Sequence, residues 1–281
     1  MESERQFTLR GAEYSYPGAA EKALCGIDLD IRKGEWIALL GSNGSGKSTF
    51  LKILSALLKP TQGVFSCFTD NACDKTKIEQ WSGTAIVFQN PEDQAVALSV
   101  EEDTAFGPEN IGMERTEIAK NVKNALNAVG LSGMENRLVS ELSGGQKQRL
   151  ALAGVLAMKP HTILLDEPLS MLDPQTRREF IKIIEKEHAA GKTIVQTGHS
   201  LKEIRSCTRV IILDKGRIKA DMPRKEFFDL TAEEIKTLGF EKPALETLFE
   251  MMKNEGLTDK ETIPCVQSAT EILLCRSQRK I

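Results

Sequence analysis

The sequence lacks any run of roughly 18 consecutive apolar residues, the length at which a segment becomes a candidate for crossing a bilayer. Its first residues, MESERQFTLRG, lack the apolar core of a secretion signal. It also lacks a basic surplus, because 37 Lys and Arg residues stand against 40 Asp and Glu residues, for a formal net charge of -3. Surfaces that bind nucleic-acid phosphates usually carry such a surplus. We therefore expect no membrane span, no nucleic-acid partner and a chain that stays in the cytoplasm.

The cysteines form no recognisable metal-binding or redox pattern, because none stands in a CxxC spacing and no histidine partner lies nearby. Disulfides are uncommon in the cytoplasm. We interpret the cysteines as buried or inactive thiols and not as a zinc site or a disulfide framework. They are Cys25, Cys67, Cys73, Cys207, Cys265 and Cys275.

The sequence does contain an alternation of strand-like and helical segments. Of its 281 residues, 41% are hydrophobic, which is enough for a large core. Short apolar runs at 35–40, 84–88, 162–165 and 193–197 are separated by helical patterns at 48–58, 92–158 and 174–188, and a hairpin turn is expected at 214–216. Strands separated by helices predict an α/β fold with a parallel sheet. We divide the chain into a core at 1–225, whose helical insert is 92–158, and a mostly helical extension at 226–281 that breaks at Pro243.

The most informative motif is a glycine-rich loop between the first of these strands and the first helix, which matches GxxxxGK[S/T]. Glycines let backbone N–H groups turn inward around phosphate oxygens, and the following helix adds its positive end. In such a loop the lysine is expected to neutralise the β and γ phosphates, and the serine after it to ligate Mg²⁺. The segment consists of Gly41, Ser42, Asn43, Gly44, Ser45, Gly46, Lys47, Ser48 and Thr49.

The apolar strand at 162–165 runs directly into two carboxylates, Asp166 and Glu167. A buried parallel strand delivers its last residues to the edge of the sheet where the glycine loop is also expected. Asp166 can then hold Mg²⁺ through its water shell, and Glu167 can polarise an attacking water. Many strands end in acids, so this interpretation depends on the glycine loop.

A third motif is Leu142 followed by Ser143, Gly144, Gly145 and Gln146, at the start of a helix that reaches about residue 158. The simple interpretation is a capping box, in which Ser143 caps the helix and Gln146 stands three residues later. Two glycines in the first turn nevertheless reduce helix stability. Their benefit would be a bare helix N-terminus that a phosphate can approach, and the motif therefore predicts a second phosphate site.

Together these motifs resemble those of the ATP-binding-cassette (ABC) ATPases. The glycine loop, LSGGQ and the strand ending in two acids occur in this order and spacing over about residues 5–220. The resemblance implies a P-loop NTPase core with an inserted helical subdomain and an antiparallel β part, and it implies binding of ATP and Mg²⁺. In that family LSGGQ of one subunit closes over the γ-phosphate held by a second subunit. The active unit is thus expected to be a homodimer or a heterodimer with a paralogous ATPase.

The resemblance also assigns roles at the γ-phosphate. Gln89, in the stretch VFQNPEDQ, is similar to the glutamine that touches Mg²⁺ and the attacking water and that senses the transmembrane partner. His199 stands where the family has a histidine at the γ-phosphate. Gly198 and Ser200 depart from the usual threonine and aspartate on either side, which leaves the role of His199 intact but could alter the rate.

Three further residues carry a role and an alternative. Ser170 and Asp173 fall in the loop that communicates across the dimer in the ABC family, although Asp173 would also serve as the cap of the helix that begins at residue 174. Tyr16 stands where the family often has an aromatic ring stacked on adenine. The alternative is that Tyr16 packs on a strand face with Tyr14 nearby.

Within the ABC family, three stretches resemble the ATPase subunits of energy-coupling-factor importers, which take up vitamins or transition-metal ions such as cobalt and nickel. These stretches are 87–94, 105–110 and 170–174, and the extension at 238–256 is also similar. The resemblance implies peripheral binding at the cytoplasmic face of the cell membrane, to a transmembrane coupling subunit and a membrane substrate-binding subunit that selects the substrate. The alternative is a soluble, non-transport ABC ATPase that acts as an ATP-switched binding module. The chain has neither the second cassette nor the long coiled coils of such proteins.

Overall fold

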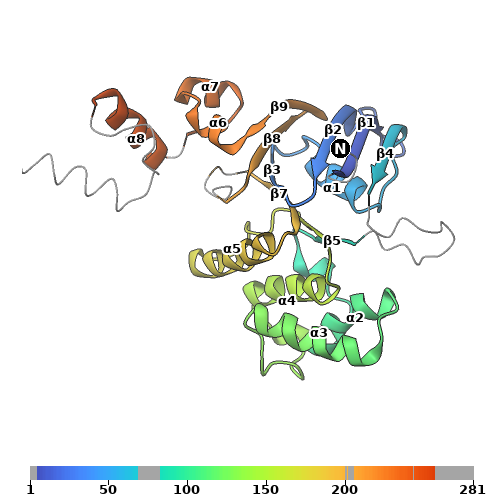
Figure 1. Cartoon of the computed structure of the whole chain (residues 1–281). Helices are drawn as coiled ribbons and strands as arrows, with labels where there is room; N and C mark the ends of the chain where they lie inside the picture. The colour runs from blue at the N-terminus through green and yellow to red at the C-terminus, as the bar shows by residue number, and fades with distance from the viewer. Residues whose placement is uncertain (1–4, 69–82, 200, 202–205, 243, 257–281) are drawn as a thin grey trace, which may run out of the picture.

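The computed structural model of the protein describes residues 5–68, 83–199, 201, 206–242 and 244–256 (Figure 1). Within these ranges it contains two sheets, a group of helices below them and a helical C-terminal part. None of the described helices is long and apolar enough to span a membrane. The predicted α/β class is confirmed.

A six-stranded sheet forms the centre of the molecule, in the order β5-β6-β7-β3-β8-β9. Every neighbouring pair is parallel except β8 and β9, which form an antiparallel hairpin at one edge. The inner strand β3 is buried along its whole length, as its continuous apolar sequence predicts. The strands are β3 (Trp36–Leu40), β5 (Thr84–Val87), β6 (Thr162–Leu165), β7 (Thr193–Gly198), β8 (Arg209–Asp214) and β9 (Arg217–Pro223).

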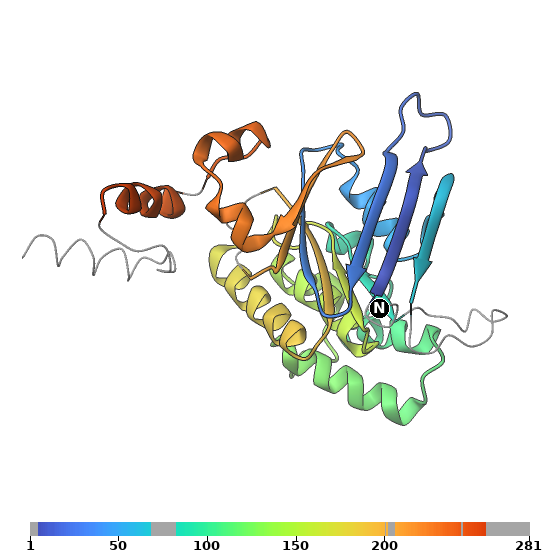
Figure 2. The ribbon, with the colours of Figure 1, turned by 45° about the horizontal axis from the view of Figure 1, so that its top comes forward.

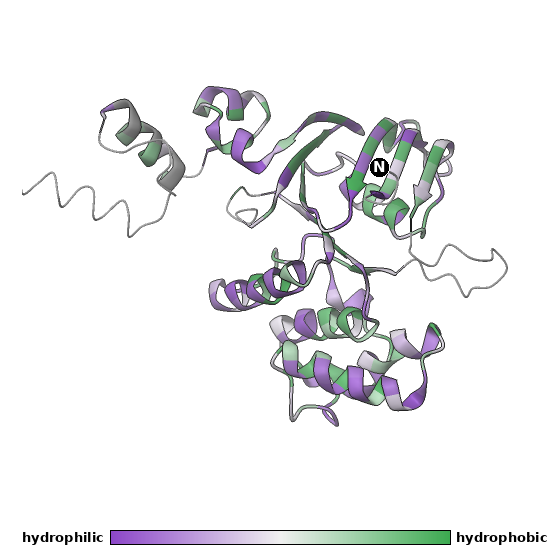
Figure 3. Cartoon of the chain, in the orientation of Figure 1, coloured by the Kyte–Doolittle hydropathy of each residue, from purple (hydrophilic) through white to green (hydrophobic). Residues whose placement is uncertain are grey.

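A second sheet is antiparallel and has three strands, in the order β2-β1-β4. Its strands are β1 (Arg5–Tyr14), β2 (Leu24–Arg32) and β4 (Gln62–Cys67). Side chains alternate along β3, so that Ile37 and Leu39 join a core cluster with this sheet and α1 (Lys47–Leu54), while Ala38 and Leu40 join the cluster on the opposite face. The hydropathy colouring shows many apolar residues on the strands of both sheets (Figure 3).

The helix α1 is shorter than the sequence predicted. It ends at Leu54, four residues before the expected end at residue 58. Ala56 has a φ of 60°, which is the left-handed conformation and cannot continue a right-handed helix. The apolar pattern beyond Leu54 therefore belongs to a turn in which Leu57 is exposed.

The helical insert lies below the six-stranded sheet and forms a separate group in Figure 1. It contains α2 (Val100–Asn110), α3 (Arg115–Ala128) and α4 (Gly144–Ala157), with short 3₁₀ turns at Pro91–Asp93 and Val139–Glu141. After β6 the chain enters α5 (Pro174–Ala189), which begins where the sequence predicted and which leads back to β7. The insert thus lies in sequence between β5 and β6, both of which point at the same edge of the sheet.

The C-terminal part follows β9 and contains α6 (Arg224–Asp229), α7 (Ala232–Thr237) and α8 (Ala244–Asn254). It lies beyond β8 and β9, on the side of the molecule opposite the three-stranded sheet, in both ribbon views (Figures 1 and 2). Phe227 of α6 and Ile235 of α7 are fully buried and join the core cluster of the sheet. The predicted break at Pro243 and the predicted helical segment after residue 256 lie outside the described residues.

Candidate nucleotide-binding site

The glycine loop runs from the end of β3 to the start of α1 and is packed tightly against its own chain. A Cβ added to Gly41 would lie 2.4 Å from the backbone oxygen of Leu213, and one added to Gly46 would lie 2.5 Å from that of Ala23. Gly46 also has a φ of 105° and immediately precedes the helix. These positions need glycine because a backbone oxygen cannot move aside cheaply and because the φ of Gly46 disfavours a side chain.

No described side chain caps the start of α1, and no acidic residue stands in its first turn. The N–H groups and the positive end of the helix therefore face the loop without a built-in partner. This arrangement, with the loop backbone wrapped in front of it, suits an anion such as a phosphate group.

Lys47 lies inside this loop, and only 4% of its surface is exposed. Its Nζ donates to the backbone oxygens of Gly41 at 2.9 Å and Ser42 at 3.1 Å, and it lies 3.6 Å from Oε1 of Glu167. Burial lowers the pKa of Lys47, and the nearby Glu167 and Asp166 carboxylates oppose that shift. A buried cation is thereby held at the base of the loop, where it can pair with added negative charge.

The two acids at the end of β6 are positioned by Thr197 of the neighbouring strand β7. The Thr197 hydroxyl donates to Oδ1 of the buried Asp166 at 2.9 Å, and the backbone N–H of Glu167 donates to the same hydroxyl oxygen at 2.8 Å. Glu167 has a φ of 46°, a left-handed conformation that is uncommon for a residue with a side chain. Strained backbone of this kind is frequent at functional sites, where the surrounding structure holds it in place.

The Glu167 carboxylate is the point on which the other candidate groups converge. Gln89 donates from Nε2 to Oε2 at 3.1 Å, and Nε2 of His199 lies 2.6 Å from Oε1. Nδ1 of His199 lies 3.2 Å from the Gly41 oxygen, so both ring nitrogens face oxygen acceptors. Five residues predicted from four separate motifs are thereby connected by direct contacts, and they are Gly41, Lys47, Gln89, Glu167 and His199.

Tyr16 lies at the other end of the glycine loop. Its hydroxyl is 3.1 Å from Oγ1 of Thr49, and its ring meets that of Tyr14 edge to face with centroids 4.9 Å apart. Tyr14 is buried on β1, whereas Tyr16 is 40% exposed beyond the end of the strand. Both the proposed ring contact with a base and the alternative of packing beside Tyr14 remain compatible with this position.

A cavity of about 430 Å³ follows the glycine loop. Residues from four separated parts of the chain line it, and they include both ends of the candidate site. They are Tyr16, Ala23, Asn43, Gly44, Ser45, Gly46, Lys47, Ser48, Thr49, Gln89 and Glu167. The sequence analysis missed Ala23 and Thr197, because their role depends only on which strands become neighbours.

The LSGGQ segment does not line this cavity. Ser143 caps α4 by accepting from the Gln146 N–H at 3.3 Å, while the Gln146 side chain accepts from the Ser143 N–H at 2.8 Å, so the predicted capping box is present. A Cβ on Gly144 would meet no atom within 4 Å, and one on Gly145 would lie 3.4 Å from the Thr176 side chain. The start of α4 is thus stable within its own chain and open on one side.

The loop between β6 and α5 connects the acids to the LSGGQ segment. The Ser170 hydroxyl donates to the Glu167 backbone oxygen at 2.9 Å. Asp173 caps α5 by accepting from the N–H groups of Gln175 at 2.9 Å and Thr176 at 3.1 Å, which confirms the cap. The Thr176 hydroxyl and these N–H groups hold the pKa of Asp173 below its ordinary value. A role of Ser170 and Asp173 across a dimer stays a prediction.

The remaining sequence expectations concern cysteines and the residues around His199. Cys25 and Cys67 are partly buried and Cys207 is buried, and the described residues contain no cluster of metal-ligating side chains. The other three cysteines lie outside the described residues. Gly198 ends β7 just before His199, and Ser200 also lies outside the described residues.

Comparison with known proteins identifies the family. Residues 24–170 match the ABC transporter family model. An energy-coupling factor transporter ATP-binding protein, EcfA1, of Caldanaerobacter subterraneus subsp. tengcongensis is 42% identical over 254 residues, which cover 89% of this chain and 90% of the relative. The EcfA1 of Clostridioides difficile is 39% identical over 87% of this chain and 89% of its own length.

Solved structures agree with this assignment. The structure of cbiO1 from Clostridium perfringens, described as part of the ABC transporter complex cbiONQ, aligns with a TM-score of 0.71 at 33% identity, over 88% of this chain and 99% of that one. The dimeric bacterial ABC transporter cassette MJ0796 aligns with a TM-score of 0.68 at 28% identity, over 77% and 98% of the two chains. With its glycine loop, paired acids and LSGGQ segment in place, the chain belongs to the ABC transporter family, as an ATP-binding ATPase of the energy-coupling factor type.

Proposed function

We propose that the chain is the ATP-hydrolysing subunit of an energy-coupling factor importer, which closes as a dimer on ATP and drives uptake of a vitamin or a transition-metal ion through membrane partners. The observation that carries the proposal is the convergence of Lys47, Gln89 and His199 on the Glu167 carboxylate beside the glycine loop. The names of the relatives support the transport part of the proposal.

The residues at the site fit ATP with Mg²⁺. Ser48, Gln89 and Asp166 offer hydroxyl, amide and carboxylate oxygens, which are the hard ligands that Mg²⁺ prefers. Ser45 adds a buried hydroxyl for which the described residues offer no hydrogen-bond partner, on the loop that would surround the phosphates. Mg²⁺ bound by these oxygens would neutralise phosphate charge.

The chemistry assigned to the protein is the transfer of the γ-phosphoryl group to water, which gives ADP and phosphate. Lys47 holds the β and γ phosphates, and the loop N–H groups orient them. Glu167 accepts a hydrogen bond from the attacking water and polarises it, while Gln89 keeps that water in line. His199 leaves its contact with Glu167 to donate to the γ-phosphate. Tyr16 stacks on adenine.

The LSGGQ segment completes the site from a second subunit. Ser143, Gly144, Gly145 and Gln146 lie outside the cavity of their own chain, although their helix start is open to an anion. ATP then binds the closed dimer better than the open one, and this difference in affinity sets how far the equilibrium shifts. Ser170 and Asp173 lie on the loop between β6 and α5, which runs from Glu167 beside the glycine loop to the start of the LSGGQ helix. The second subunit is an identical chain or a paralogue.

The membrane partner is assigned to a groove between the six-stranded sheet and the helical insert. This groove has a volume of about 420 Å³. Its wall contains Phe88, which precedes Gln89 in the sequence, and Pro91 and Gln94, which follow it. Leu57, Val96 and Phe106 line it with large apolar side chains that are about half exposed, at 57%, 57% and 46%. Apolar patches of this kind mark interaction sites. We assign this groove to a short helix of a transmembrane coupling subunit, and the proposal therefore includes binding of the chain at the cytoplasmic face of the membrane.

Replacing Glu167 with Gln tests the catalytic part of the proposal. The amide keeps the size of the side chain but is a poor acceptor for a proton, so turnover should fall by about 100-fold or more while ATP still binds. Size-exclusion chromatography should then show an ATP-dependent dimer that does not decay. Undiminished turnover in Glu167→Gln would remove this residue from its role.

A second experiment tests the membrane partner. The chain, expressed with its genomic neighbours, should sediment with membranes and be released when Phe106→Glu places a charge in the groove. Val64→Glu, at a similarly exposed apolar residue on β4, is the matched control. A chain that never sediments with membranes would contradict the transport function and favour the soluble ATPase.

A further inference from the structure

The hairpin turn between β8 and β9 contacts the glycine loop but does not line the nucleotide cavity. Asp214 pairs with Arg217 across the turn, so that Lys215 and Gly216 form a two-residue hairpin loop. Their φ values are 46° and 74°, and positive φ at both central residues is typical of the type I′ turn. Asparagine, aspartate or glycine is usual at the first of these two positions, whereas here the turn carries a lysine.

Gly216 is buried in this turn and connects two other segments of the chain. Its backbone N–H donates to the backbone oxygen of Ser45, in the glycine loop, at 3.0 Å. Its backbone oxygen accepts from the N–H of Cys25, at the start of β2, at 2.8 Å. Three parts of the chain that are far apart in sequence therefore meet at one residue.

The bond to Ser45 fixes the direction of an N–H group in the glycine loop. The Ser45 oxygen and the Gly46 N–H belong to one planar trans peptide unit, in which the two groups point in opposite directions. Because Gly216 holds the oxygen, the Gly46 N–H is turned away from the hairpin, and Gly46 is one of the residues that line the cavity. N–H groups of such a loop are the donors to a phosphate group. The hairpin therefore orients a phosphate donor although it does not line the cavity.

The space around Gly216 leaves no room for a side chain. A Cβ added there would lie 2.8 Å from the Ala23 oxygen, and this same oxygen would lie 2.5 Å from a Cβ added to Gly46. Leu213 of β8 meets the first residue of the loop, because its oxygen would lie 2.4 Å from a Cβ on Gly41. Contacts at both ends of the glycine loop therefore come from the hairpin and from the chain that enters β2.

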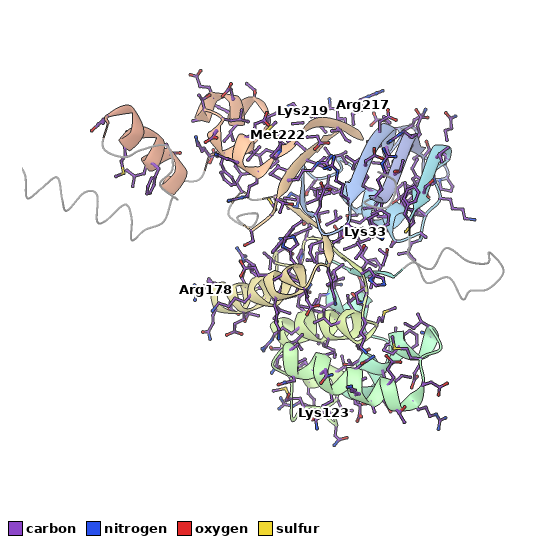
Figure 4. All side chains as sticks on the ribbon, in the orientation of Figure 1. Lys33, Lys123, Arg178, Arg217, Lys219 and Met222 are labelled. Atoms are coloured by element: carbon purple, nitrogen blue, oxygen red, sulfur yellow. The ribbon has the colours of Figure 1, made fainter. Side chains whose placement is uncertain are left out.

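The hairpin itself is held by the central sheet and by the C-terminal part. β8 pairs with β3, the strand that leads into the glycine loop. On β9, Lys219 donates from Nζ to the Thr237 backbone oxygen of α7 at 2.8 Å, and Figure 4 shows Arg217 and Lys219 on this edge strand. The turn is thus fixed by contacts outside the nucleotide site, which an element that positions the glycine loop requires.

We propose that Gly216 is a positioning residue for nucleotide binding, because its N–H holds the Ser45 oxygen and thereby directs the N–H groups of the glycine loop at the β-phosphate. The inference rests on the binding of ATP to this loop, as described under the proposed function. The β-phosphate is common to ATP and ADP, so a change at Gly216 weakens the binding of both nucleotides. Glu167 and Gln89 act at the γ-phosphate instead, and turnover of bound ATP therefore depends less on Gly216.

Replacing Gly216 with Ala tests the contact through nucleotide affinity. The new methyl group would meet the Ala23 oxygen at 2.8 Å, and alanine disfavours a φ of 74°. The Kd of ADP, measured on the full chain by calorimetry, should rise by about tenfold or more, because hydrogen bonds to charged groups are strong. The KM for ATP should rise by a similar factor, while kcat at saturating ATP should change by less than about threefold, as expected when ground-state binding is lost.

Two substitutions separate this effect from strain in a turn and from the charge of the lysine. Gly191→Ala, just after α5, is the matched control, because Gly191 has a left-handed φ of 89° but a Cβ there would meet no atom within 4 Å. It should lower Tm and leave the Kd of ADP near that of the parent. Lys215→Asn keeps a residue that suits the turn and removes the charge, and it should also bind ADP like the parent. A comparable loss of affinity in either control would contradict the role of Gly216.

Amide hydrogen exchange in the unaltered chain gives a second measurement, which also decides the question if Gly216→Ala does not fold. Binding of ADP should slow the exchange of the Gly216 amide, because a loop that holds a phosphate keeps the Ser45 oxygen in place. The Gly191 amide, which donates to the His188 oxygen at 2.8 Å, is the control and should exchange at an unchanged rate. An unchanged rate at Gly216 would overturn the inference.

The outcomes separate this inference from the function on which it rests. If the parent chain does not bind ADP, nucleotide binding by the glycine loop and the role of Gly216 are both wrong. If the parent binds ADP and a folded Gly216→Ala binds it equally well, the positioning role alone is wrong. A fall in kcat with an unchanged KM would also overturn that role, because Gly216 would then act on turnover and not on binding.

Discussion

The glycine loop and the LSGGQ turn both start a helix, yet their surroundings are opposite. The glycine loop is enclosed, so that an added Cβ on Gly41 would meet the Leu213 oxygen at 2.4 Å, and Lys47 lies buried within it. The LSGGQ turn is open, so that a Cβ on Gly144 would meet nothing within 4 Å. One helix start has charges and acids assembled around it, and the other has only its capping box.

This difference explains why the two turns need glycine for separate reasons. In the glycine loop, Gly41 and Gly46 are required because the chain's own backbone leaves no room for a side chain at these positions. At Gly144 the chain itself imposes no such requirement, so the glycine is useful only if another molecule approaches the helix start closely. The comparison fits two half-sites that become complete across a dimer.

The largest effect is expected from Gly41→Ala. The new methyl group would overlap the Leu213 oxygen and displace the loop, which should reduce turnover by about 100-fold, since a displacement of roughly 1 Å can cost that much. The free energy of unfolding should fall by about 1–3 kcal/mol from overpacking. ATPase assays and urea unfolding measure the two effects. Gly154→Ala on α4, where a Cβ would meet only the Asp103 oxygen at 3.9 Å, is the control and should be tolerated.

Gly144→Ala sharpens the comparison because stability and activity should change in opposite directions. The free energy of unfolding should stay equal or rise by up to about 1 kcal/mol, since alanine favours a helix and meets no atom of its own chain. Turnover should fall at least about tenfold, equivalent to roughly 1.4 kcal/mol, because the methyl group keeps a phosphate away from the N–H groups. Full activity in this variant would mean that no phosphate approaches Gly144.

The smallest effect concerns Asp173, the cap beside the open turn. Its folded pKa lies below the ordinary 3.8, so its stabilising contribution is present above that value and is lost as the pH falls through the folded pKa. Asp173→Ala should therefore lower Tm slightly at neutral pH, and the difference from the parent should shrink as the pH falls below 3.8 and through the lower folded pKa. Asp173→Asn, which can still cap the helix, should retain most of the Tm. A difference that grows in acid would contradict this account.

Much of the fold was predictable because its strands are short apolar runs that end at glycine, proline or acidic residues. The strands at 35–40, 84–88, 162–165 and 193–197 all appear in the sheet within one or two residues of the predicted bounds. The end of α1 was not predictable, because the left-handed Ala56 carries no sequence signal. The three-stranded sheet was expected only from the family resemblance, since its pairing joins segments far apart in the chain.

The sequence by itself determined the chemical groups of the site, because each motif is a short run of neighbouring residues whose spacing reflects its chemistry. Only the tertiary structure decided how these groups meet. Thr197 fixes Asp166 from 31 residues away, and Gln89 reaches Glu167 across 78 residues, because β5, β6 and β7 lie side by side. Gly216 likewise meets Ser45 only because β8 lies beside β3, a long-range contact that local patterns do not encode.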